Sequence, residues 1–559
     1  MKRLEAYVLL AVLGAGVFLA GLELMVTAVA LPRIIPDLAA WTELRRASWI
    51  INAYLLVYVV TMPLAGRLTD LWGARRLFLA ALAVFTVGSV LAGRAQSLDE
   101  LIAARVVQAV GGGAIVPVAT AAASHLFEGD ARPRALGVVG ALTFLGMAAG
   151  PFVGAAVLEL LHPETALPSL GLSGGPLFHA LAPGWRWVFY VNVPVGIVAL
   201  VLTWAAGDWE TPRHPVRLDL AGAALFSLAL AAGLIALTLL GSTEPIAGVA
   251  PGTLITGLAV VATGAAGLFV AWGLRRRDPF LDPRLFRQSV FGAAALVSLL
   301  TGYGFLTAIV GGAVFVDRVL YGGPDQQRYV LGALAAATAL GALASGLLVR
   351  TLSLRLVTLV GLLLSAGALW RMSGWQPATP IEEVAASMGV FGLGFGLTVT
   401  PRSTAAVEAA GQRLFGAASA TVTVARHVGM AVGLAILTAY GSSTIDRLNH
   451  QVFATPEAYR SVLPAALRDR PLRDGLVVQA LEEWASGQAA GIMVGLFLVA
   501  AGVTLVAIPP GLVLGTRRRM LTGTADAPVG APGASGPGSG SDGRRGEADG
   551  DGGAEPIVL

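Results

Sequence analysis

The sequence predicts an all-α polytopic membrane protein with fourteen transmembrane helices. Hydrophobic residues make up 55% of the 559 positions and charged residues only 13%, whereas a soluble domain carries about 25% charged residues. The mean hydropathy is +0.74. Apolar runs of about 20 residues, the length that crosses a bilayer core of about 30 Å, recur along the whole chain.

The predicted spans are apolar runs separated by polar or glycine-rich segments. The first run follows Lys2 and Arg3. It is too long for the apolar part of a signal peptide, so we predict that it remains as a helix. In order, the spans cover residues 6–31, 47–65, 77–93, 99–123, 135–161, 187–206, 219–241, 254–274, 290–315, 329–349, 354–371, 385–400, 416–440 and 489–514.

The positions of the arginines predict the orientation in the membrane. The strongest clusters are RRRDPFLDPRLFR at 275–287 and the three arginines at 517–519. When the N-terminus is placed inside, both clusters and most other loop arginines fall on the inner side, as the positive-inside rule requires. We therefore expect both termini in the cytoplasm. A net charge of only +4, spread over short loops, gives no reason to expect a nucleic-acid partner.

A weak internal repeat predicts the domain organisation. GLLVRTLSLR at 346–355 follows the tenth span much as GRLTDLWGARR at 66–76 follows the second. Transporters are often built from such repeats, with the substrate site between the halves. We predict an N-terminal six-helix bundle (1–206), two inserted helices with a basic loop (207–289) and a C-terminal six-helix bundle (290–515). The Gly-, Pro- and Ser-rich tail (516–559) is predicted to be disordered.

Two predicted outside loops are long. Segment 162–184 is rich in proline and glycine. Segment 441–488 contains apolar residues at helical spacing, which predicts a short amphipathic helix on the outer surface.

The stretch GRLTDLWGARR is an inside loop in this prediction. Arginines alone would be typical of a simple anchor at the membrane surface, but the acid and the paired glycines go beyond that role. The glycines allow close approach to neighbouring helices. The acid can pair with an arginine or accept hydrogen bonds from the N-terminal amides of a helix. The residues concerned are Gly66, Asp70, Gly73, Arg75 and Arg76.

This stretch resembles the signature loop of the major facilitator superfamily, G-x-L-x-D-x-x-G-x-R-R/K, which latches the cytoplasmic gate in the outward-open state. ARVVQAVGGGA at 104–114 resembles the fourth-span motif R-x-x-Q-G-x-G of that family, with Ala109 in place of a glycine. The resemblance implies the major facilitator fold, in which two six-helix bundles rock against each other.

Further motifs resemble the fourteen-span drug:proton antiporters of the QacA and EmrB type. GMAAGPFVGA at 146–155 is similar to the antiporter motif of the fifth span, and WRWVFYVNVPVG at 185–196 to the start of the sixth. DPFLDPRLFR, before the ninth span, is similar to that family as well. This resemblance implies proton-driven export across the inner or plasma membrane of a bacterial cell.

Two other stretches resemble the branch of this family that contains mycobacterial exporters of triacylglycerol and glycolipid. They are the WI-x-x-x-YLL-x-Y-x-x-x-MPL-x-GR run at 49–67 and the V-x-VAR-x-x-GM frame at 422–430. That branch carries an acid shortly before its fifth-span motif, and Phe144 occupies this place here. The resemblance therefore implies lipid export with chemistry that is not identical.

Three charged residues lie deep within predicted spans, where charge is costly and usually functional. Glu23 and Arg105 lie about 13 Å and about 9 Å from the outer ends of their spans, at about 1.5 Å per residue. We predict that Glu23 exchanges protons beside Arg105. The alternatives are a permanent ion pair that clips two helices and an acid that binds a cationic substrate.

The third of these residues, Arg426, lies near the middle of the thirteenth span. It could bind an acidic or phosphate-bearing substrate, pair with Glu23 across the cavity, or serve in helix packing. Its neighbour His427 points about 100° away on an ideal helix, which favours a packing role for the histidine.

Small residues on one face of the fifth span predict a close helix crossing. A proline beside them weakens the backbone hydrogen bonds there, so the crossing could also act as a hinge. The residues are Gly146, Gly150, Pro151 and Gly154.

The combined prediction is a proton-coupled exporter of lipophilic or amphipathic compounds of the multidrug type, working by alternating access. Lipid export toward the outer envelope is the alternative. We expect no cofactor beyond the proton gradient, no metal and no enzyme activity, because the sequence has no HExxH motif and no histidine cluster with ligand spacing. Expected partners are protons, membrane lipids and an extracytoplasmic lipid-carrier protein.

Overall fold

The structure is a computed structural model that describes residues 3–38, 49–129, 131–169, 175–206, 209, 219–240, 248–277, 279–411, 414–453, 458–471 and 473–515. The predicted disordered tail, 516–559, lies outside these residues. Within them the chain is built from helices, and fourteen are long and apolar enough to cross a membrane. The prediction of an all-α polytopic membrane protein with fourteen spans is therefore confirmed.

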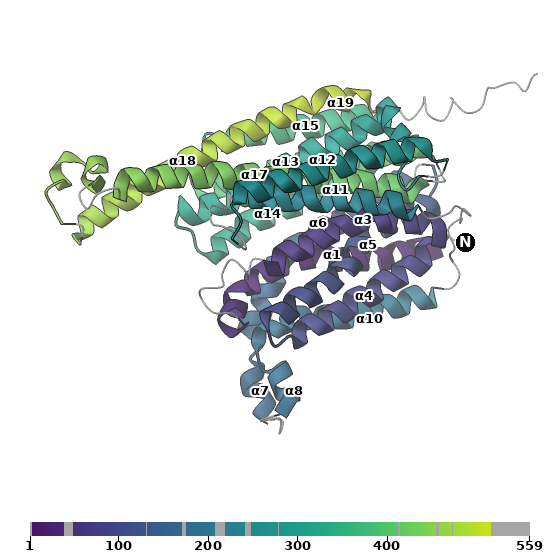
Figure 1. Ribbon diagram of the computed structural model, residues 1–559, viewed down its shortest axis with the longest axis horizontal. Coiled ribbons are helices and arrows are strands. Elements are labelled where there is room, and N and C mark those ends of the chain that lie inside the picture. Colours follow the sequence, from purple (N-terminus) through teal and green to yellow (C-terminus); the bar gives the residue numbers. More distant parts are fainter. Residues whose placement is uncertain are drawn as a thin grey trace, which may run out of the picture. The chain divides into compact units, whose positions relative to one another are not determined.

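The first half of the helices runs from α1 to the inserted pair α11 and α12 (Figure 1). In order they are α1 (Arg3–Leu38), α3 (Trp49–Trp72), α4 (Ala74–Arg94), α5 (Leu98–Leu126), α6 (Ala131–Leu160), α7 (Pro163–Ser169), α8 (Gly175–Leu181), η2 (Gly184–Arg186), α9 (Trp187–Tyr190), α10 (Asn192–Ala205), α11 (Leu220–Leu239) and α12 (Pro251–Arg275).

The second half begins with the 3₁₀ turn that leads out of the inserted pair. Its elements are η3 (Pro283–Arg287), α13 (Ser289–Arg318), α14 (Pro324–Leu348), α15 (Leu354–Met372), α16 (Ile381–Ala410), α17 (Phe415–Phe453), η5 (Ala458–Val462), η6 (Ala465–Leu467), α18 (Gly475–Val506) and α19 (Ile508–Val513).

Two pairs of helices make the most extensive contacts between the first and second halves. Helix α3 packs against α17, and α6 packs against α14. The inserted helices α11 and α12 pack on each other, and α11 also contacts both α3 and α17. Residues 1–517 form one compact unit by their contacts, so the domain boundaries at 206 and 289 stay a prediction.

Several helices are longer than predicted. Helix α16 continues ten residues past the predicted end at 400, through Pro401, and α17 continues to Phe453. The amphipathic surface helix predicted within 441–488 is wrong for the described part of that segment. The chain there is the end of α17, two 3₁₀ turns and the start of α18, because the apolar spacing at 475–488 belongs to the long helix α18 itself.

Asp219 fastens the inserted pair at one end. Its carboxylate caps α11 by accepting a hydrogen bond from the Gly222 amide at 3.0 Å. It also accepts one from the Trp272 indole at 3.0 Å and one from the Phe280 amide at 3.1 Å. Burial opposes the charge, but these hydrogen bonds outweigh it and lower the pKa of Asp219. One carboxylate thus ties α11, α12 and the segment before α13 together.

Candidate functional site

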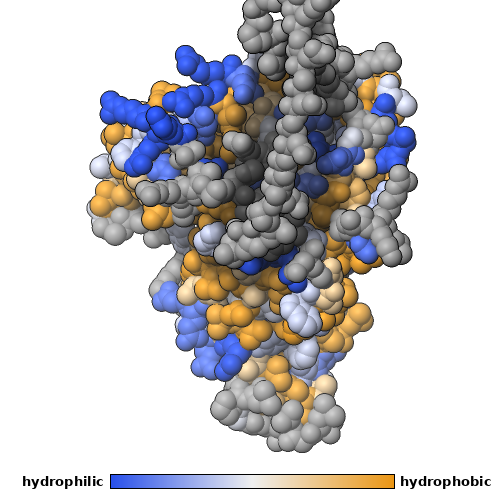
Figure 2. Space-filling model, turned by 90° about the vertical axis from the view of Figure 1, so that its right-hand side faces the viewer, coloured by the Kyte–Doolittle hydropathy of each residue, from blue (hydrophilic) through white to orange (hydrophobic). Residues whose placement is uncertain are grey.

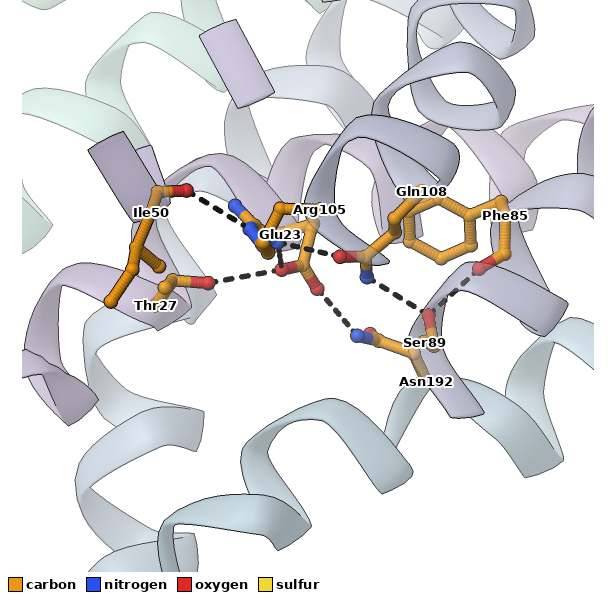
Figure 3. Close-up of polar contacts among 8 residues, drawn as sticks. All are labelled: Glu23, Thr27, Ile50, Phe85, Ser89, Arg105, Gln108 and Asn192. Carbon is orange, nitrogen blue, oxygen red and sulfur yellow. Dashed lines mark hydrogen bonds and ion pairs between the residues drawn. The ribbon is translucent and has the colours of Figure 1, made fainter. Parts of the chain in front are cut away.

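A buried acid lies among the first six spanning helices. Glu23 of α1 is 0% exposed. One carboxylate oxygen accepts hydrogen bonds from the Thr27 hydroxyl at 3.0 Å and from the guanidinium of Arg105 on α5. The other accepts a hydrogen bond from the side-chain amide of Asn192, the first residue of α10. Three helices therefore converge on one carboxylate (Figure 3).

Arg105 makes further contacts through two of its nitrogens and through its flat face. It donates to the side-chain oxygen of Gln108 at 2.6 Å and to the Ile50 backbone carbonyl at 3.3 Å. Its guanidinium carbon lies 3.9 Å from the centre of the Tyr54 ring. The charges of Glu23 and Arg105 thus compensate each other inside the helix group, as a buried pair requires.

Two polar atoms beside this pair have no hydrogen-bond partner among the described residues. They are the hydroxyl of Tyr54 and the side-chain oxygen of Asn192. A Cβ on Gly112 would lie 2.6 Å from the Tyr54 oxygen, so only glycine leaves room for that hydroxyl. These two polar atoms beside the Glu23–Arg105 pair can therefore form a hydrogen bond with a water molecule or take part in the transfer of a proton.

The predicted gate loop is mostly helix. Gly66 and Asp70 lie in the last two turns of α3, and the interruption consists of Gly73 alone, whose φ of 87° favours glycine. Arg75, near the start of α4, donates to the Trp204 carbonyl at 3.1 Å, and Arg76 is exposed. The prediction of a loop over 66–76 is wrong because the helical hydrogen bonds of α3 continue until Gly73.

Asp70 reaches across to the start of α17. Its two carboxylate oxygens accept hydrogen bonds from the amides of Gly416 and Ala417, at 2.9 and 3.1 Å. This is the second of the two bonding modes predicted for the acid, and it matches the preference of a helix N-terminus for negative charge. A Cβ on Gly66 would lie 2.5 Å from the Gly416 carbonyl oxygen, so the two helices touch through their backbones.

The end of the molecule where α3 ends and α17 begins is called the gate end here. The helix pair α6 and α14 also meets closely at this end, since a Cβ on Gly137 would lie 2.9 Å from the Ala342 carbonyl oxygen. Hydrophilic residues gather on this face (Figure 2). Its exposed arginines include Arg275, Arg276, Arg277, Arg284, Arg287, Arg350 and Arg355.

A sequence model of a protein family, described as "Major Facilitator Superfamily", matches residues 13–434 of this chain. The chain belongs to the major facilitator superfamily. The resemblance drawn from the sequence motifs is therefore confirmed, and the protein is a multi-pass membrane transporter of that superfamily.

Within this superfamily, the chain is similar in sequence to curated mycobacterial transporters. A triacylglyceride transporter of Mycolicibacterium hassiacum is 31% identical, over 92% of this chain and 93% of that protein. One of Mycolicibacterium smegmatis is 31% identical, over 76% and 74%. One of Mycobacterium tuberculosis is 31% identical, over 71% and 75%. These relatives belong to the mycobacterial lipid-exporter branch that the sequence runs at 49–67 and 422–430 resemble.

Solved superfamily structures share the fold. A bacterial homologue of the human lysosomal transporter Spinster, inward-facing and occupied, superposes with a TM-score of 0.56 at 16% identity, covering 95% of this chain and all of that one. The proton:xylose symporter XylE gives a TM-score of 0.54 at 11% identity, covering 91% and 97%. At this level of identity the likeness concerns the fold alone.

The predicted hinge glycines lie where α6 of this superfamily member crosses α1. A Cβ on Gly146 would lie 2.1 Å from the Phe18 carbonyl oxygen, and one on Gly150 would lie 2.8 Å from the Met25 side chain. Gly154 is buried on the same helix, and Pro151 stands inside it. The close crossing is present, and the hinge role stays a prediction.

The arginine of α17 does not pair with Glu23. The guanidinium carbon of Arg426 lies 5.5 Å from the centre of the Phe144 ring, while Glu23 is occupied by Arg105. His427 is buried, bonds to the Thr423 carbonyl at 2.8 Å and packs its ring 5.7 Å from that of Tyr58. It therefore packs between α17 and α3, as predicted.

Sequence reasoning missed two residues of these sites. Asn192 stands in an otherwise apolar motif, and nothing in the sequence points to its contact with Glu23. Arg402 of α16 is 1% exposed, yet the predicted span ended two residues before it. The proline at 401 inside the helix hid this buried ionisable residue from the prediction.

A cavity of about 260 Å³ lies between α3, α11 and α17. Its lining is mainly apolar and includes Leu55, Leu234 and Met430, and polar atoms come from few residues such as Asn52 and His427. Such a lining suits a lipophilic compound whose orientation is fixed by a small number of polar contacts.

Proposed function

We propose that the chain is a proton-coupled exporter that carries a lipophilic or amphipathic compound, with lipid as the favoured cargo, by alternating access. The observation that carries the proposal is the fully buried carboxyl group of Glu23, bonded by side chains of two further helices. A carboxyl group in this setting can bind a proton in one conformation and be balanced by Arg105 in the other.

Lipid is favoured over other cargo for two reasons. The cavity beside α17 has a largely apolar lining, and the curated relatives are named triacylglyceride transporters. Drug export is the second candidate, because Phe144 occupies the place of the acid carried by the lipid-exporting branch.

The proposed orientation follows from the arginines. Many exposed arginines lie at the gate end. We therefore propose that this end faces the cytoplasm of a bacterial cell, with both termini on that side. The proton gradient is the proposed energy source, with no cofactor. A lipid that leaves on the other side is insoluble in water, which favours a carrier protein as the receiving partner.

The test is transport in sealed proteoliposomes that contain the purified chain. An imposed pH gradient should drive the movement of a fluorescent triacylglyceride, and the Glu23→Gln variant should lose this coupling. Vesicles with a cationic dye in place of the lipid separate the two cargo candidates. Glu159→Gln is the matched control, because this glutamate side chain is 62% exposed and its variant should transport normally. Proton coupling would be refuted if the substrate flux were the same with and without the pH gradient and the same in the Glu23→Gln variant.

A further inference from the structure

Two arginines lie close together in the second half of the chain, Arg402 fully buried and Arg426 partly buried. Arg402 of α16 donates a hydrogen bond to the Thr301 hydroxyl of α13. The next residue, Gly302, packs against α17, since a Cβ there would lie 2.1 Å from the carbonyl oxygen of Arg426. The phenylalanine rings that the two guanidinium groups face, Phe395 and Phe144, lie 5.5 Å apart.

No carboxylate among the described residues forms an ion pair with either arginine. Each guanidinium instead faces a phenylalanine ring. The distance from guanidinium carbon to ring centre is 5.1 Å for Arg402 and Phe395, and 5.5 Å for Arg426 and Phe144. A ring face offsets only part of the cost of a buried charge. Arg105 shows the contrast, because it has a full carboxylate partner.

Three phenylalanines from three helices enclose this region. The rings of Phe144 and Phe395 lie 5.5 Å apart, those of Phe144 and Phe305 5.4 Å, and those of Phe305 and Phe395 4.3 Å. Rings packed in this way exclude water, which strengthens the attraction between an arginine and an anion. The Ser298 hydroxyl, one helical turn before Thr301, is fully buried and has no hydrogen-bond partner among the described residues.

We propose that Arg402 and Arg426 bind the anionic head group of an amphiphilic substrate, and that the apolar pocket lined by Phe144, Phe305 and Ile309 takes its hydrocarbon chain. The planar guanidinium matches a carboxylate or a phosphate monoester with two parallel hydrogen bonds. Both head groups carry the oxygen acceptors that the arginines and Ser298 need. The inference rests on the proposed export function and adds a charge to the cargo that a triacylglyceride does not have.

The experiment compares ligands that share one hydrocarbon chain. Dissociation constants for the full-length protein in nanodiscs are measured with oleate, oleyl phosphate, oleyl alcohol and oleylamine, by competition with radiolabelled oleate. At least one anion should bind ten-fold or more tightly than the alcohol, and the amine most weakly. Tighter binding of oleate identifies a carboxylate cargo, and tighter binding of oleyl phosphate identifies a phosphate cargo. Equal binding of alcohol and anions would overturn the proposal.

Variants locate the binding site. Arg402→Gln and Arg426→Gln should each weaken anion binding by ten-fold or more and leave the affinity for the alcohol unchanged. Arg402→Lys keeps the charge but loses the planar pair of donors, so it should keep only part of the preference. The control is Arg371→Gln, which removes the same charge from a side chain that is 62% exposed. Unchanged oleate binding in Arg402→Gln would refute the assignment. If that variant does not fold, the ligand series on the unmodified chain decides.

The proposal and the export function fail in different ways. A Glu23→Gln variant that keeps its preference for anions but is also unaltered in transport would refute proton coupling and support the arginine site. A chain that moves neutral triacylglyceride along a pH gradient and shows no preference for anions would keep the export function and refute the arginine site.

Discussion

The carboxylate of Asp70 accepts a hydrogen bond from the backbone amide of Gly416, at 2.9 Å across 346 positions of sequence. With the second bond to the Ala417 amide, it caps the N-terminus of a helix from the other half of the chain. A side-chain cap normally belongs to the helix it stabilises. Here the cap comes from α3, so the contact exists only while α3 and α17 are together.

Removal of this cap should loosen the gate end. Asp70→Ala removes both hydrogen bonds and a negative charge beside the α17 N-terminus, which together stabilise by about 1–2 kcal/mol. The chain has no cysteine, so a Ser419→Cys substitution gives one buried reporter thiol on α17. Maleimide should label this thiol at least several-fold faster in the Asp70→Ala background. Equal labelling rates would contradict a latch role for Asp70.

The backbone contact at the gate should tolerate no side chain. Gly416→Ala places a methyl group 2.2 Å from the Gly66 carbonyl oxygen, so the gate end cannot close fully and transport should fall about ten-fold or more. Gly441→Ala on the same helix is the matched control, because no heavy atom lies within 4 Å of its Cβ. Both are measured as initial rates in proteoliposomes. Equal loss in the two variants would point to helix stability instead.

The Glu23–Arg105 pair should show strong coupling in stability. Arg105→Gln leaves a buried carboxylate without its countercharge and should destabilise the protein by about 3–5 kcal/mol. The double variant Glu23→Gln/Arg105→Gln has two neutral amides and should recover part of this loss. Thermal unfolding of the four proteins in detergent completes the cycle. Additive effects of the two substitutions would show that the groups do not interact.

The hydrogen bonds of Asp219 should make the free energy of unfolding depend on pH in the acid range. The pKa of Asp219 is lowered in the folded protein by its hydrogen bonds, so its stabilising contribution is present above the ordinary aspartate pKa of about 3.9. It is lost as the pH falls through the lower, folded value. Asp219→Ala should therefore lower the melting temperature at pH 7, and the difference from the unmodified chain should shrink toward pH 3. Trp272→Phe, which removes one donor and keeps a ring, should reproduce part of the effect at pH 7.

Apolar length and motif spacing carried most of the fold prediction. Fourteen spans could be counted because each must satisfy its backbone hydrogen bonds inside the bilayer, which forces long apolar helices. Helix ends were less predictable. A proline such as Pro401 usually ends a helix in a soluble protein, but α16 continues past it because neighbouring helices surround it, and this hid Arg402.

The residues of the site were predictable only where a single charged residue lies within an otherwise apolar run. Glu23 and Arg105 were found by that criterion, and the structure pairs them. Asn192 and the contact of Arg426 with Phe144 were not predictable, because each depends on which face of a distant helix lies opposite. The bond from Asp70 to the start of α17 was one of two alternatives, and the sequence contained no information on which helix N-terminus would lie within reach.

The glycine contacts at the gate end have a mechanical consequence. Where Gly66 meets Gly416 and Gly137 meets the α14 backbone, no long side chain interlocks the helices. At these two backbone contacts themselves, the helices can separate without a change of rotamer. Resistance to opening at this end therefore comes from the two hydrogen bonds of Asp70 and from the buried Phe415 ring, which packs against His125 and Arg132 of the first half.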